Sequence, residues 1–333
     1  MPQGYLQTGQ KACYDASGAV ISCPGSAQDG ELRKGLPLPE PRFAIQGELV
    51  HDRLSGLVWT KNANLAEFPL TWQEALDYIA QLNADHAFGQ ADWRLPNRRE
   101  MRSLLHFETR KPALPPEHPF ENVFLNWYWT STTAAINPAY AWYVHLEGAR
   151  MFYGHKEQYY LFWPVRGGEN TVLPATGQRD CFDATGVKIP CAGSGQDPEH
   201  QTGFSWPQPR FEVEGDTVVD RLTGLRWLRQ ASLSSAPVSW PRAFELIRDL
   251  NESSAFTWRL PNINELESLV DCSCFDPALP QQHPFAEVQE VYWSATTSYF
   301  EPDWAWALYM VKGATGVGVK SGESFHVWPL TDA

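Results

Sequence analysis

The sequence predicts an α+β protein made of two tandem copies of one domain, on three observations. The pentapeptide at 93–97 returns unchanged at 258–262, within a longer repeat of cysteine, Tyr-Trp, Ala-Trp and Trp-Pro pairs. Each copy carries two helix-type patterns with capping signals, and each ends in runs typical of antiparallel strands. We expect one domain over 1–168 and a second over 169–333.

The composition is that of a folded protein and excludes several classes of partner. The chain has 333 residues, of which 43% are hydrophobic and 20% charged. Its net charge of −13 and its lack of a basic cluster exclude nucleic acid and anionic membranes as expected partners. No apolar run approaches the roughly 18 residues of a membrane span. The 15 Trp, 17 Phe and 12 Tyr serve either a core or a binding face.

The first element expected in each copy is a hairpin closed by a disulfide. Cys13 and Cys23 flank turn-forming residues, and Cys181 and Cys191 do so at the same spacing in the second copy. Two strands joined by such a turn bring their thiols within disulfide reach, so we predict these two bonds and an oxidising compartment. The first residues are polar and unlike a signal peptide, so an exported protein would have lost its leader.

Next in each copy come a short strand and two helices. The strand is expected over 57–60. A helix follows Thr71, which has a glutamate three residues on and forms a capping box, and the second copy keeps the cap as Ser239. A second helix follows Asn97 and, in the second copy, Asn262, each again with a glutamate three residues later.

After a proline-rich loop, the rest of the first copy is predicted to form strands over 128–133, 140–146, 150–154 and 160–165. Each copy therefore has a strand, two helices, a long loop and an antiparallel sheet, which is an α+β domain.

The repeated pentapeptide has an architectural interpretation. Its proline fixes the backbone of the turn that enters the helix, and its asparagine caps the first turn of the helix. Its arginine, Arg94 or Arg259, is expected to pair with a buried carboxylate, for which Asp52 and Asp220 are candidates, or to cap carbonyl groups.

No residue is assigned a catalytic role, because the sequence holds no nucleophile-elbow, zinc-protease, P-loop or dinucleotide motif. We therefore expect a protein that is not an enzyme. His118 and His283 are expected to be hydrogen-bonded inside loops. Cys272 and Cys274 have no counterpart in the first copy, and both a labile disulfide and two free thiols are open.

A cation site is one interpretation of the acidic residues around the two hairpins. Calcium is the candidate ion, because it prefers carboxylate oxygens. The alternative is that the aspartates only cap Asx-turns. The candidate ligands are Asp15, Asp29, Asp183 and Asp197.

The candidate ligand-binding surface lies where the two copies diverge after the Ala-Trp pair. Strand alternation sends Tyr143 and His145 to one face and Val144 and Leu146 to the other. Such aromatic and basic side chains can stack on sugar rings or form a protein-binding hot spot, and the alternative is that they fill the interface between the copies. The candidate residues are Tyr140, Tyr143, His145, Arg150, Tyr153, His155, Trp304, Tyr309 and Lys312.

The motifs at 8–10, 55–59, 92–97, 128–133 and 163–168 together resemble the C-terminal domain family of the Legionella collagen-like protein. The second copy departs in two places, with Thr in place of Asp before the pentapeptide and no Arg after the final Trp-Pro. The resemblance implies two tandem C-type-lectin-like domains, each with two helices packed on antiparallel strands and an N-terminal disulfide hairpin.

For function the resemblance implies less: the named member resembles an adhesin that binds sulfated glycans, whereas most relatives have no assigned activity. The net charge of −13 argues against a polyanionic ligand here. Residues 301–303, Glu-Pro-Asp, resemble the sugar-binding tripeptide of calcium lectins, whereas the first copy has Asn-Pro-Ala at 137–139.

We therefore expect a secreted or cell-surface protein, extracellular or periplasmic, that binds a glycan or a partner protein without chemistry. The alternative is a structural subunit or cap of an extracellular filament. The sequence assigns no oligomeric state.

Overall fold

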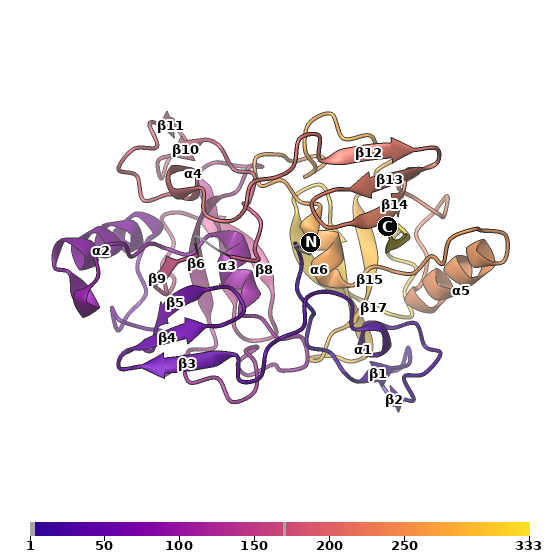
Figure 1. The fold of residues 1–333 in the computed structure, drawn as a ribbon, viewed down its shortest axis with the longest axis horizontal. Helices are drawn as coiled ribbons and strands as arrows, with labels where there is room; N and C mark the ends of the chain where they lie inside the picture. Colours follow the sequence, from indigo (N-terminus) through magenta and orange to yellow (C-terminus); the bar gives the residue numbers. More distant parts are fainter. Residues whose placement is uncertain (1–3, 169–170) are drawn as a thin grey trace.

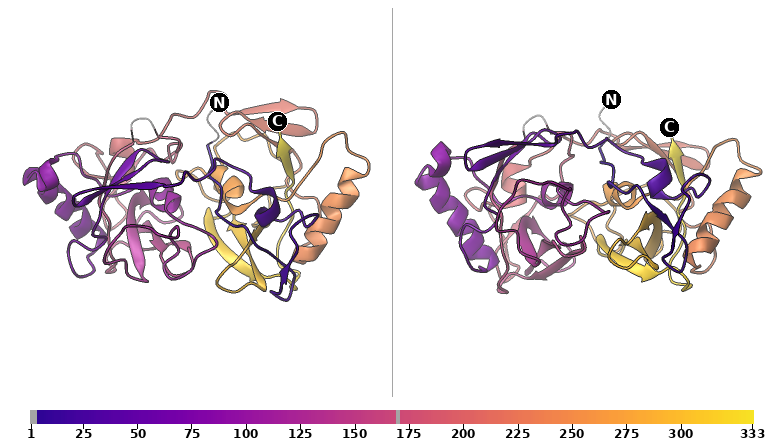
Figure 2. Two further views of the ribbon diagram at one scale, coloured as in Figure 1. Left: turned by 60° about the horizontal axis from the view of Figure 1, so that its bottom comes forward. Right: turned by 90° about the horizontal axis from the view of Figure 1, so that it is seen from below.

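The computed structural model describes residues 4–168 and 171–333. Two lobes lie side by side (Figures 1 and 2), one formed mainly by each copy. The protein is α+β with mostly antiparallel sheets, as predicted.

One six-stranded antiparallel sheet runs through both lobes. Its order is β15-β16-β17-β8-β7-β6, so the three strands of each copy mirror those of the other. The two sets meet at a single pair, Thr315 and Met151. The strands are β6 (Trp127–Thr133), β7 (Tyr140–His145), β8 (Met151–His155), β15 (Val291–Thr297), β16 (Trp304–Tyr309) and β17 (Ala314–Val319).

Each lobe also has a four-stranded sheet with one buried and one outer face. In the first lobe, Val50, Trp59 and Val165 form a cross-strand row that is fully buried. The predicted strand over 160–165 is wrong in extent, because this stretch makes only isolated bridges until the last strand begins at Val165. The sheets are β3 (Phe43–Gln46), β4 (Leu49–Asp52), β5 (Leu57–Thr60) and β9 (Val165–Gly167), and then β12 (Phe211–Glu214), β13 (Thr217–Asp220), β14 (Leu225–Leu228) and β18 (Leu330–Asp332).

The predicted helices form, and three of the four caps are confirmed. Thr71, Asn97 and Asn262 each make a complete capping box. Ser239 precedes its helix without a side-chain cap bond, and Arg242 stands where the first copy has the reciprocal glutamate. The helices are α2 (Trp72–Ala84), α3 (Arg98–Ser103), α5 (Trp240–Asn251) and α6 (Ile263–Ser268).

The arginine of the repeated pentapeptide pairs with a buried carboxylate and a backbone carbonyl, as expected, but the carboxylate is not the candidate Asp52 or Asp220. Arg94 donates to Glu100, the capping-box glutamate of α3, at 2.5 and 2.7 Å, and both side chains are buried. Asp52 is instead held by Arg42, at 2.9 and 2.6 Å. The second copy repeats both pairs, as Arg259–Glu265 and Arg210–Asp220.

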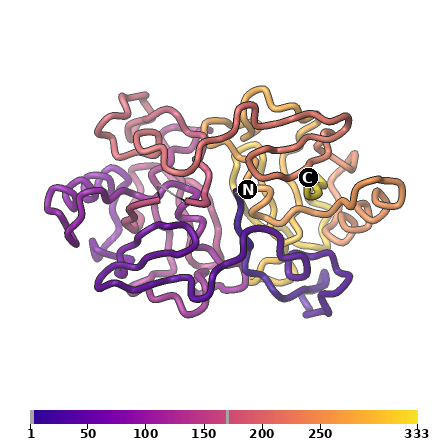
Figure 3. The backbone as a smooth tube through the Cα atoms, viewed as in Figure 1, coloured from indigo at the N-terminus to yellow at the C-terminus, as the bar shows by residue number. Residues whose placement is uncertain are grey.

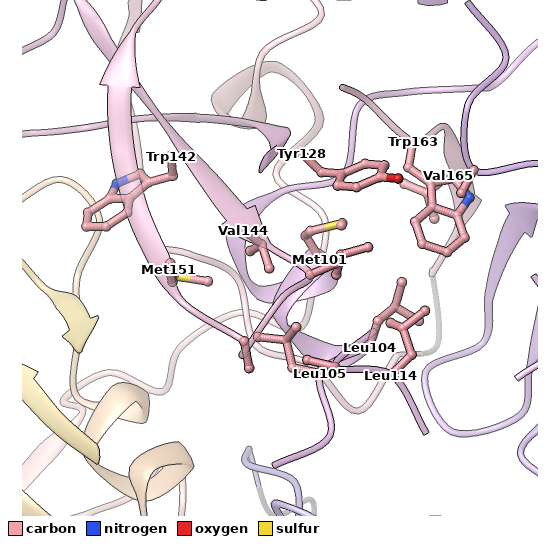
Figure 4. Packing of buried hydrophobic residues seen from close by; sticks show 14 of the residues in the cluster. Met101, Leu104, Leu105, Leu114, Tyr128, Trp142, Val144, Met151, Trp163 and Val165 are labelled. Carbon is pink, nitrogen blue, oxygen red and sulfur yellow. The ribbon is translucent and has the colours of Figure 1, made fainter. Parts of the chain in front are cut away.

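The largest hydrophobic cluster continues across the seam between the copies. Side chains of α3, β6 and β7 gather within it, among them Met101, Tyr128 and Val144 (Figure 4). Ile263, Trp306 and Ala314 of the second copy belong to the same cluster. The two copies therefore share part of one core.

The disulfide hairpin that begins each copy packs on the other copy. Figures 1 and 3 show the first hairpin at the lower edge of the second lobe, below α1, and the second hairpin at the upper edge of the first lobe, above α4 and β6. Both predicted disulfides, Cys13–Cys23 and Cys181–Cys191, are formed. The exchanged elements are β1 (Cys13–Tyr14), β2 (Val20–Ile21) and α1 (Asp29–Leu32), and β10 (Cys181–Phe182), β11 (Lys188–Ile189) and α4 (Asp197–His200).

A buried carboxylate at the start of α1 or α4 anchors each exchanged segment. Asp197 accepts hydrogen bonds at 2.7 Å from Thr176 of its own segment and from Thr132 on β6 of the other copy. The Thr132 hydroxyl also accepts the backbone N–H of Arg98 at the start of α3. Because Asp29, Thr8 and Thr296 repeat this arrangement, the recurrent threonines after Tyr-Trp serve to receive the neighbouring segment.

A buried lysine binds the turn of each exchanged hairpin. Lys156 donates to the carbonyls of Phe182 and Asp183 at 2.9 and 3.2 Å, and its Nζ lies 4.0 Å from the ring centroid of Trp72. Burial lowers the pKa of Lys156 to about 7. Lys320 contacts the first hairpin in the same way.

The buried carboxylates predict a pH dependence. Burial raises the pKa of Asp29 to about 6, so its protonated form is favoured by folding and the stabilisation is lost as pH rises through about 6. From pH 7 to pH 5, the wild type should therefore gain about 1 kcal/mol in free energy of unfolding relative to Asp29→Asn. Urea unfolding at both pH values measures this difference.

The matched control is Asp249→Asn on α5, whose carboxylate is exposed. The difference in free energy of unfolding between this variant and the wild type should change little from pH 7 to pH 5. An Asp29→Asn difference that is equally flat would contradict the role given to the buried carboxylate.

Candidate functional site: a groove on the first four-stranded sheet

The predicted aromatic row does not form one exposed surface. Tyr143 is only 7% exposed and packs against Trp127, Trp129 and Tyr160. Tyr153 lies on the opposite face of the sheet, because it is paired with Trp142. The aromatic residues are therefore divided between the two faces of the sheet, and on each face they pack against other side chains.

The other predicted binding residues are also dispersed. His145 packs on Trp127 with its Nδ1 at 2.9 Å from the Glu147 carbonyl, and His155 packs on Tyr140. Arg150 is exposed in the turn after β7, and Trp304 begins β16, half-buried. Lys312 lies near the seam, with its Nζ 4.7 Å from the Phe152 ring and 5.1 Å from that of Tyr309.

The four candidate cation ligands have other partners. Asp15 accepts from the backbone and hydroxyl of Ser17 and the N–H of Ala19, which is the Asx-turn alternative, and Asp183 repeats it. Asp29 and Asp197 are the buried anchors described above. Over residues 4–168 and 171–333, no three His, Cys, Asp or Glu side chains are grouped to hold a metal ion.

The loop that resembles a calcium-lectin tripeptide is covered by the exchanged hairpin. Gly18, at φ +85°, lies so close that an added Cβ would be 2.8 Å from the Asp303 nitrogen. In the other lobe Gly186 lies against Pro138 and Ala139 in the same way. This loop therefore serves as a docking point for the hairpin.

The two loop histidines make fewer hydrogen bonds than expected. His118 and His283 stack on Phe120 and Phe285, with ring centroids 5.9 and 6.0 Å apart. Within the described part of the chain, the Nδ1 atom of each has no hydrogen-bond partner. Stacking rather than hydrogen bonding holds these rings.

An open groove lies on the outer face of the first four-stranded sheet. Its floor is formed by His51 and Arg166, which flank the buried Val58 in one cross-strand row, and its volume is about 410 Å³. One wall is a 3₁₀ turn, η1 (Ala87–Gly89), which carries Phe88. The lining residues are Gln46, Glu48, Leu49, His51, Phe88, Gln90 and Arg166.

Phe88 is presented to solvent by its backbone. It adopts φ +56°, its edge-on contact is with Trp93 at 5.8 Å, and 39% of the residue stays exposed. A positive φ is unfavourable for a bulky residue and marks positions worth functional attention. The ring is thus held at the rim of a polar groove.

The polar groups of the groove are only partly engaged. Arg166 donates from Nε to Asp92 at 2.6 Å, which fixes its guanidinium. His51 has a buried Nε2 with no hydrogen-bond partner among the residues described. The side chains of Gln46 and Glu48 are exposed. The groove can therefore offer donors and acceptors to a polar ligand.

In the second lobe the corresponding space is filled. The equivalent floor row is Val219, Arg226 and Thr331. The Arg226 guanidinium lies 5.0 Å from the Phe256 ring centroid and donates to Glu214 at 2.6 Å. The difference between Val58 and Arg226 was visible in the sequence, but only the sheet register places these residues between the two outer strands of each row.

A larger groove of about 900 Å³ lies between the N-terminal segment and the proline-rich loop. Its lining includes Pro39, Pro115 and Pro116, and charges of both signs. It lacks an exposed aromatic ring at its rim, so the smaller groove is the better candidate for sugar recognition.

Both cysteines left open by the sequence are free thiols. Cys272 is buried, and burial raises its pKa to about 12, whereas Cys274 is half-buried.

Without denaturant or reductant, iodoacetamide at pH 8 should modify Cys274 slowly and leave Cys272 unmodified. Peptide mass spectrometry measures the two sites, with urea-unfolded protein as the control. Faster labelling of Cys272 than of Cys274 would contradict this burial.

Among the residues that the structure describes, no helix is long and apolar enough to cross a membrane.

No curated protein matches the chain. A sequence model of the Lcl C-terminal domain matches residues 48–166 and 216–331, which together make up more than half of the chain. The exchanged hairpins precede these two matched regions. The chain therefore belongs to the Lcl C-terminal domain family and carries two tandem copies of its domain.

Proposed function

We propose that the protein is an extracellular, non-catalytic carbohydrate-binding protein whose first copy holds a neutral sugar in the groove around Phe88. The observation that carries the proposal is an exposed aromatic ring held over a row of incompletely paired polar side chains.

The chemistry of the groove supports a sugar over other small ligands. An aromatic face packs well against the C–H face of a pyranose ring. Gln46 and Gln90 each offer an amide donor and acceptor, and Glu48 accepts, which suits vicinal hydroxyl groups. The protein's net charge of −13 disfavours a sulfated or otherwise polyanionic glycan.

Export and a C-type-lectin-like fold are parts of the same proposal. Two disulfides in short hairpins support an oxidising compartment. The order of strand, two helices, loop and antiparallel sheet supports the lectin-like assignment that the family resemblance implies. The proposed sugar site is remote from the tripeptide loop, so binding should not require calcium.

The test is a glycan array with the wild type, run with calcium and again with a chelator. Binding is expected in both conditions. Phe88→Ala should weaken binding of the best ligand by about tenfold, corresponding to about 1.4 kcal/mol. Val58→Arg introduces the residue that fills the second lobe's groove and should also reduce binding.

The matched control is Phe256→Ala, which removes the corresponding aromatic ring of the second lobe and should leave affinity unchanged. A blank array, or binding that neither Phe88→Ala nor Val58→Arg reduces, would refute the proposed site. A blank array would then favour a protein partner or an assembly role.

A further inference from the structure

Three buried arginines lie at the seam where α3 of the first copy faces α6 of the second. Arg98, Arg99 and Arg102 are 0%, 5% and 6% exposed. The equivalent positions on α6 are Ile263, Asn264 and Glu267, so the two sides of the seam differ in charge. This asymmetry interrupts an otherwise repeated arrangement.

The positive charge of this cluster exceeds the negative charge beside it. Glu267 is the shared carboxylate, at 3.3 Å from Arg98, 3.7 Å from Arg99 and 3.9 Å from Arg102. A second carboxyl, Asp271, lies within the electrostatic influence of Arg179 and Arg210 more than of Arg99, and burial raises its pKa. Burial and the neighbouring arginines lower the pKa of Arg102 to about 10, which leaves it cationic at neutral pH.

Several guanidinium donors of the cluster are unused. Arg99 donates through Nη2 to the Val270 carbonyl at 2.8 Å, and Arg102 donates to Asn264 at 3.0 Å. Within residues 4–168 and 171–333, Nε of Arg99 and both Nε and Nη1 of Arg98 have no hydrogen-bond partner. A buried charge without a partner is unfavourable, so a further negative partner would stabilise the cluster.

A small cavity opens beside Arg99 and Arg102, whereas Arg98 does not line it. Its volume is about 40 Å³, and its lining includes Arg99, Arg102, Ser103, Asn264 and Glu267. A cavity needs roughly 10–15 Å³ of such space to hold one water molecule. The space therefore has room for a small ion.

We propose that this cavity binds a small inorganic anion of the size of chloride, held by Arg99 and Arg102 at the seam between the two copies. The anion offsets the excess positive charge and so stabilises the packing of α3 against α6. The inference is independent of the sugar site, which lies on the outer face of the first sheet.

The direct test uses bromide as the probe. Crystals of the full chain grown or soaked in sodium bromide should show an anomalous difference peak between Arg99 and Arg102. The absence of a peak there, in a map that locates bromide elsewhere, would overturn the proposal.

The solution test compares sodium chloride with sodium gluconate at equal ionic strength. Chloride should raise the melting temperature of the wild type by about 2–4 °C. Arg99→Asn, which introduces the residue found on α6, should lose most of this difference. Arg248→Gln, which removes an exposed charge from α5, should keep it.

An equal chloride effect in the wild type and in Arg99→Asn would also overturn the proposal, because a general salt effect does not depend on Arg99. If Arg99→Asn does not fold, the bromide map of the wild type decides alone.

Discussion

The architecture depends on a buried carboxylate that accepts hydrogen bonds from two threonine hydroxyls. Asp29 and Asp197 each start a short helix in an exchanged segment, and each accepts a hydrogen bond from a threonine of the other copy. The hydroxyl of that threonine also accepts the backbone N–H of the first residue of α3 or α6, so the anchor also positions these helices. Removing it would therefore disturb both the exchange and the seam.

The exchange makes the two copies interdependent. Each lobe is completed by a disulfide hairpin from the other, and the continuous six-stranded sheet and shared core add contacts at the middle. A buried lysine over a tryptophan ring holds each hairpin turn through backbone carbonyls, which depends little on the turn's side chains. This arrangement explains why the anchor residues recur in both copies.

The two lobes share one backbone arrangement but carry different side chains at positions that do not hold this arrangement together. On the outer sheets, Val58 leaves a groove open, whereas Arg226 closes the equivalent space against Phe256. At the seam, the arginines of α3 face a different set of residues on α6. Both proposals concern places where the repeat is broken while the surrounding backbone is retained.

The sequence by itself determined the features that depend on neighbouring residues. These are the duplication, the two disulfides and the capping boxes at Thr71, Asn97 and Asn262, because a short turn or a spacing of three residues specifies each of them. Ser239, which lacks the reciprocal glutamate, is the exception and makes no side-chain cap bond.

Only the tertiary structure decided which segments meet. The partner of Arg94, the covering of the loop at 301–303, the splitting of the aromatic row and the groove beside Phe88 all depend on residues far apart in the chain. A repeated hairpin is equally compatible with packing on its own copy or on the other, because identical docking residues occur in both. The course of the chain and the packing of distant residues decide on which copy each hairpin lies, and no local sequence pattern encodes them.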